Sequence, residues 1–129
     1  MGYVKSLRDL EVYRLSRNLS RDVFEYSKAF PKEERHSLTD QIRRSSRSIG
    51  GQIAEAWAKR KYEKHFVSKL TDADGEQLET QHWIETAVDC TYISNELAST
   101  LLDQYASLGK MLNSMMSKSE MFCKPPSSS

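Results

Sequence analysis

The sequence of 129 residues predicts an all-α protein, an antiparallel up-down-up-down four-helix bundle. Apolar residues recur at steps of three or four, which is the spacing of one face of a helix. The chain has only five glycines and three prolines, so few positions interrupt a helix. The periodic segments are long and their connections are short, and such helices pack most simply as a bundle.

The first predicted helix spans residues 8–30 and ends before Pro31, because proline cannot continue a helix. Its expected buried stripe comprises Val12, Leu15, Leu19, Val23, Tyr26 and Phe30. The second predicted helix spans residues 37–60, and Ser37 with Asp40 three residues later resembles a capping box. Its expected buried residues are Leu38, Ile42, Ile49, Ile53, Ala56 and Trp57.

Gly50 and Gly51 lie inside this second helix. Each costs up to about 1 kcal/mol of helix stability relative to alanine. A kink or a close helix crossing would justify that cost, and the small residues nearby favour a close approach. No glycine-rich loop after a strand is present to hold a phosphate, so a structural role is the preferred interpretation.

The third predicted helix spans residues 62–92 and the fourth spans residues 95–117. The expected stripe of the third comprises Phe66, Leu70, Ala73, Gln77, Thr80, Ile84, Ala87 and Val88. That of the fourth comprises Leu97, Leu101, Tyr105, Leu108, Leu112 and Met115, with Ser94 as the expected N-cap. Residues 1–117 are therefore expected to form the bundle domain. Residues 118–129 lack this periodicity and are expected to form a flexible C-terminal tail.

Charge is distributed unevenly along the chain, although the net charge is only +1. Between Lys69 and Lys110 there are eight acidic residues and no lysine or arginine. From Lys32 to Lys69 there are ten basic residues and five acidic ones. We therefore expect one cationic and one anionic surface, which suits head-to-tail self-association or an anionic partner.

The third helix carries apolar residues on both sides of its core stripe. At 100° per residue, Val67 and Leu78 fall to one side, and Trp83 and Cys90 fall to the other. Scattered apolar residues are normal on a surface. The sharper interpretation is a subunit interface, and heterologous contacts of this kind close a homo-oligomeric ring when acidic and basic faces fix their orientation.

The sequence does not indicate an enzyme. It contains no nucleophile elbow, Cys-x-x-Cys pair or phosphate-binding loop. Two Glu-x-x-His pairs, Glu33 with His36 and Glu79 with His82, resemble part of a di-iron site. The first pair falls in a connection between helices, so we expect no metal and no cofactor. The two cysteines give no disulfide framework, and no apolar run reaches membrane length, so a cytoplasmic protein without membrane contact is expected.

Three segments carry a resemblance to a known family. They are LRDLEVYRLS from Leu7 to Ser16, FPKEERHSLTDQIRRSSRSIGGQIAEAWAKR from Phe30 to Arg60, and HFVSKLTDADGEQLETQHWIETAVDC from His65 to Cys90. In this order they resemble the bacterial 23S rRNA intervening-sequence proteins, over about residues 7–115. The resemblance implies a four-helix bundle that assembles as a homopentamer and has no established catalytic activity.

The same resemblance bears on partners. Some genes of the family lie within insertions in ribosomal RNA genes, which suggests RNA or nucleoprotein binding. The bundle is also similar, at the level of fold alone, to the accessory protein that partners reverse transcriptase in diversity-generating retroelements. A protein-binding adaptor, for a reverse transcriptase for example, without nucleic-acid contact is therefore the alternative function.

The basic residues of the second helix are the candidates for contact with an anionic partner. They are Arg43, Arg44, Arg47, Lys59, Arg60, Lys61 and Lys64. Phosphate contact by such side chains is independent of sequence and sensitive to salt. Two other interpretations stay open: Arg43 and Arg44 pair with acids of a neighbouring third helix, or the charges form a solvated face.

Overall fold

The computed structural model describes residues 4–123 and is all-helical in that range. Its four long helices are α1 (Glu11–Ser27), α2 (Leu38–Ala58), α3 (Glu63–Asp89) and α4 (Asn95–Ser117). Short 3₁₀ helices occupy η1 (Leu7–Asp9), η2 (Lys32–Glu34) and η3 (Ser119–Met121). The predicted bounds of the fourth helix are confirmed, and those of the other three were too long by one to three residues at each end.

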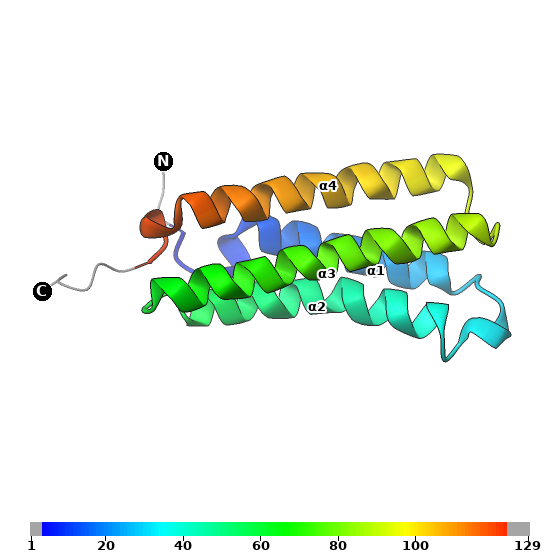
Figure 1. Ribbon diagram of the computed structural model, residues 1–129, viewed down its shortest axis with the longest axis horizontal. Helices are drawn as coiled ribbons and strands as arrows, with labels where there is room; N and C mark the ends of the chain where they lie inside the picture. The colour runs from blue at the N-terminus through cyan, green and yellow to red at the C-terminus, as the bar shows by residue number, and fades with distance from the viewer. Residues whose placement is uncertain (1–3, 124–129) are drawn as a thin grey trace, which may run out of the picture.

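The four helices lie along the long axis of the molecule and are joined at alternate ends (Figure 1). Each helix packs against its neighbours in sequence, and α1 also packs against α4. One apolar core runs between them, and its largest fully buried side chains include Tyr105, Phe66 and Ile49. The predicted stripe of α3 is confirmed from Phe66 to Ala87, including the polar Gln77 and Thr80.

The buried face of α1 differs from the prediction, and Leu15 is only partly buried. Tyr26 is 41% exposed, whereas Ser16 and Ser27 are buried. Ser16 faces α2 at Gly50, where a Cβ would lie in ordinary van der Waals contact, 3.4 Å from Oγ of Ser16. Ser27 accepts a 2.7 Å hydrogen bond from Nε of Arg43. The helices meet at Gly50, but packing there does not require a glycine, because a Cβ would make only ordinary van der Waals contacts.

The predicted capping box at the start of α2 is wrong. Ser37 occupies the N-cap position, but its side chain caps no backbone amide. Glu34 performs the capping instead, because its Oε1 accepts from the amide of Leu38 at 3.2 Å and from Oγ of Ser37 at 2.7 Å. A carboxylate at a helix N-terminus also opposes the positive end of the helix dipole. At α4 the predicted cap is confirmed, since Oγ of Ser94 accepts from the amide of Leu97 at 3.1 Å.

The C-terminal segment packs on the bundle as far as Cys123, which the prediction of a flexible tail from residue 118 did not anticipate. Ser119 is buried and donates a hydrogen bond to Glu63 at the start of α3. The ring of Phe122 stacks on Phe66, with the ring centroids 5.9 Å apart. The rest of the expected tail, residues 124–129, lies outside the described range.

Candidate functional site

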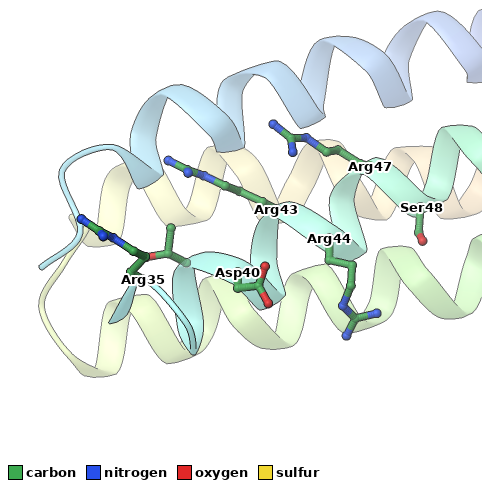
Figure 2. A pocket seen from close by; sticks show the side chains of 7 residues that line it. Arg35, Asp40, Arg43, Arg44, Arg47 and Ser48 are labelled. Carbon is green, nitrogen blue, oxygen red and sulfur yellow. The ribbon is translucent and has the colours of Figure 1, made fainter. Parts of the chain in front are cut away.

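The three arginines of the RRSSR segment leave α2 in two directions (Figure 2). Arg43 and Arg47 are four residues apart and point toward α1. Arg44 points toward α3, because each residue advances about 100° around a helix. The predicted basic set therefore does not form one face.

Phe24 of α1 organises the cations on the α1 side. The guanidinium carbons of Arg43 and Arg47 lie 4.7 and 5.4 Å from the centroid of its ring, and Nζ of Lys28 lies 4.9 Å from it. A cation over an aromatic face is attracted by the negative face of the ring. Together with the bond from Arg43 to Ser27, these contacts fix two guanidinium groups beside α1.

These side chains border a shallow groove of about 570 Å³, which we call the arginine groove. It is lined by Arg35, Arg43, Arg44 and Arg47, with Asp40 and Ser48 among the other residues. Within residues 4–123, no carboxylate oxygen lies within 4.0 Å of the side-chain nitrogens of Arg35, Arg43 or Arg47. Three of the four arginines of the groove therefore have no carboxylate within ion-pair distance in the described part of the chain, although Asp40 is among the lining residues.

Arg44 is engaged on the other side of α2. Its Nη2 lies 3.8 Å from Oε2 of Glu79 on α3, and the same oxygen accepts a 3.0 Å hydrogen bond from Nε1 of Trp83. Burial raises the pKa of the nearby Glu76, and the Glu79 carboxylate raises it further. Arg44 thus pairs with an acid of its own α3, and an exposed pair of this kind contributes at most about 1 kcal/mol.

The second part of the predicted basic set lies at the other end of α2. Lys59 is twelve positions after Arg47, which is about 18 Å along a helix. Arg60 is held there, with its guanidinium carbon 3.5 Å from the ring centroid of Trp57 and its Nε donating to the Trp57 carbonyl at 2.9 Å. Lys61 and Lys64 are exposed. The structure thus places these residues apart from the arginine groove.

The four predicted interface residues also lie apart. Leu78 is 56% exposed on α3. Trp83 lies five residues further, about 140° around the helix, on the side where Glu79 meets α2. Val67 is partly buried against the core, and Cys90 is exposed at the end of α3. They occupy two flanks of α3 rather than one patch.

The uneven charge of the sequence appears as two grooves on different helix pairs. A depression between α3 and α4 is lined by Glu85, Asp89 and Asp103, among other residues. The arginine groove is lined instead by residues of α2 and of the connection before it. In the described part of the chain, no group of three or more His, Cys, Asp or Glu side chains could hold a metal ion. No described helix is long and apolar enough to cross a membrane.

Residues 8–114 match the sequence model of the 23S rRNA-intervening sequence proteins. The chain belongs to this family. A solved structure similar to it is a protein of unknown function from the S23 ribosomal protein family of Bacteroides thetaiotaomicron, with 27% sequence identity and a TM-score of 0.74. The similarity covers 82% of this chain and 95% of that protein. Among curated proteins, none matches. The resemblance inferred from the three segments is therefore confirmed, and the functional assignment rests on the geometry.

Two contributors to the arginine groove were missed from the sequence. Arg35 lies in the connection before α2, and Phe24 lies on α1 beside the core stripe. The basic character of residues 32–69 was the only signal for Arg35. For Phe24 there was none, because its role depends on how α1 and α2 are aligned. In this 23S rRNA-intervening sequence protein, periodicity alone gave no reason to expect that the ring of Phe24 would hold two arginines.

Proposed function

We propose that the protein is a non-enzymatic, homo-oligomeric scaffold that binds RNA, free or in a nucleoprotein, through the arginine groove. One observation carries the proposal: Arg43 and Arg47 are fixed by Phe24 and Ser27 without a carboxylate partner in the described chain. Arginine presents a planar set of donors that fits phosphate oxygens in pairs. Side chains that are already positioned lose less conformational freedom when they bind.

The proposal includes the assembly. We infer that antiparallel, up-down-up-down protomers form a closed ring, with five subunits by family resemblance, in the cytoplasm. The exposed Leu78 and the separation of acidic and basic grooves support heterologous contacts. Replacing Leu78 with Glu should lower the native mass, whereas replacing the exposed Ser68 with Glu should leave it unchanged. An unchanged mass for Leu78→Glu would remove this residue from the interface.

The binding test compares charge reversal at Arg47 and at Lys61 by fluorescence anisotropy with a labelled structured RNA at several salt concentrations. Arg47→Glu should abolish most of the affinity, because Arg47 faces the arginine groove. Lys61→Glu is the control with the same change of charge and should weaken binding less, because Lys61 is exposed beyond the far end of α2, apart from the arginine groove. Wild-type affinity should fall steeply with salt as counterions compete. Native mass is measured for each variant.

Three results would contradict the proposal. If wild-type protein binds no RNA at low salt, the protein-binding adaptor becomes the better function, and a reverse transcriptase is one partner to test. If Arg47→Glu dissociates the ring, the groove serves subunit pairing. If Lys61→Glu and Arg47→Glu weaken binding equally, the contact is with overall charge and not with the arginine groove.

A further inference from the structure

We propose that the groove between α1 and α2 takes a single strand of RNA, with phosphates along Arg43 and Arg47 and an unstacked base against Tyr13. The inference rests on the proposed RNA binding and deepens it by naming the form of the nucleic acid. It extends the site beyond the arginine groove, onto α1.

The arginine groove continues into a second depression. This second depression, of about 260 Å³, lies between α1 and α2, and we call it the tyrosine groove. It is lined by Tyr13, Arg17, Arg47, Gly50, Gly51 and Ala54, together with serines of both helices. Arg47 lines both grooves. An RNA backbone whose phosphates contact Arg43 and Arg47 therefore reaches Tyr13.

Tyr13 is an aromatic ring among cations. It is partly buried, and the guanidinium carbon of Arg17 lies 5.8 Å from its ring centroid. Beyond it, Arg8, Arg14 and Arg17 line a third depression together with Tyr13. A basic groove with an aromatic side chain along it is the common arrangement for single strands, because every base has a face that can stack. In a duplex the bases are stacked on one another and cannot reach the ring.

The two glycines of α2 acquire different roles in this arrangement. A Cβ at Gly50 would lie 3.4 Å from Oγ of Ser16 and 3.8 Å from Cε1 of Tyr13. Gly50 therefore faces side chains of α1, with which a Cβ would make ordinary van der Waals contacts. A Cβ at Gly51 would meet nothing within 4 Å, so packing does not require glycine there. Its missing side chain keeps the tyrosine groove open beside Arg47, which accounts for a helix-weakening residue that packing leaves unexplained.

The test uses fluorescence anisotropy with an unstructured single-stranded RNA and a duplex of the same length at one salt concentration. The single strand should bind more tightly. Tyr13→Leu, which keeps an apolar side chain, should weaken single-strand binding about tenfold, since stacking of one base on an aromatic ring is lost. Gly51→Gln should weaken it similarly by filling the groove. Gly75→Gln is the matched control, because Gly75 is an exposed glycine of α3 with nothing within 4 Å of its Cβ position.

The outcomes separate this inference from the proposed function. If RNA binding requires Arg47 but Tyr13→Leu and Gly51→Gln bind like wild type, or if duplex binds as tightly as single strand, the inference is overturned and RNA binding stands. If wild type binds neither form at low salt, both fail. Poly-glutamate serves as competitor: if it displaces the single strand as well as unlabelled RNA does, the groove accepts acidic protein and the inference is overturned. Circular dichroism and native mass verify that each variant is folded and assembled.

Discussion

The phenol of Tyr92 donates a 2.8 Å hydrogen bond to Oε2 of Glu34. This bond joins the turn between α3 and α4 to the connection between α1 and α2. The Tyr92 ring also packs on Phe30, with centroids 5.5 Å apart. Glu34 caps α2 with its other oxygen, so one carboxylate holds three segments together.

We predict that this carboxylate makes stability depend on pH. Hydrogen bonds from Ser37, Tyr92 and the Leu38 amide lower the pKa of Glu34 below its ordinary value of 4.5. A lowered pKa means that the stabilisation is complete above the unfolded-state pKa and is lost as pH falls through the folded-state pKa. Urea unfolding should show that Glu34→Gln is less stable than wild type near neutrality and that the difference shrinks in acid. A difference that stays constant with pH would contradict this role.

The same bond should appear in the titration of tyrosine. Donation to Glu34 raises the pKa of Tyr92 to about 12, because ionised Tyr92 would place two negative charges together. The difference between the spectrophotometric titrations of wild type and Tyr92→Phe reports the titration of Tyr92 alone. In Glu34→Gln the same difference titration should move toward the ordinary value of 10.0. If it does not move, the hydrogen bond is not formed in solution.

Periodicity predicted the fold well where one apolar stripe dominates. The stripe of α3 and both ends of α4 follow from the 3.6-residue repeat and from the Ser94 cap. The start of α2 did not follow, because Glu34, in the preceding turn, caps the helix in place of the expected Ser37. The packed C-terminal residues did not follow either, since single contacts such as Phe122 on Phe66 have no period.

The candidate site was predicted only in part, and the reason is geometric. Sequence indicates that arginines cluster on α2, but adjacent arginines leave a helix in different directions. Arg44 meets Glu79 whereas Arg43 meets Ser27. Which of them faces α1 depends on the alignment of two helices, which meet at Ser16 and Gly50.

We predict that Thr91→Gly stabilises the protein. Helix α3 ends in a Schellman motif, with the Tyr92 amide bonded to the Ala87 carbonyl and the Thr91 amide bonded to the Val88 carbonyl. Thr91 has a φ of 60°, a left-handed conformation that is costly for a β-branched residue. Glycine should raise the free energy of unfolding by about 1 kcal/mol. Thr91→Ala, which retains a Cβ, is the control and should gain less stability. An equal gain would mean that the β-branched side chain, and not the Cβ itself, causes the strain.

Two further glycines should respond to alanine in opposite directions. At Gly75 a Cβ meets nothing within 4 Å, so Gly75→Ala should stabilise by up to about 1 kcal/mol through helix propensity. At Gly109 a Cβ would lie 2.7 Å from Nε2 of Gln77, which donates to Asp74 in a nearly inaccessible position. Gly109→Ala should therefore cost about 1–2 kcal/mol despite its better propensity. Denaturant unfolding measures both, and a stabilised Gly109→Ala would show that Gln77 moves aside freely.

The C-terminal segment should contribute to stability through Phe122. Its ring covers Phe66, which is fully buried in the folded chain. Phe122→Ala should lower the free energy of unfolding by about 1–2 kcal/mol, because a half-buried aromatic side chain is lost and Phe66 is exposed. Met121→Ala is the matched control: Met121 is the preceding residue and is 68% exposed, so its truncation should change stability by less than about 0.5 kcal/mol. Equal effects of the two variants would mean that this segment does not pack on Phe66 in solution and that the chain beyond Lys118 contributes little to the core.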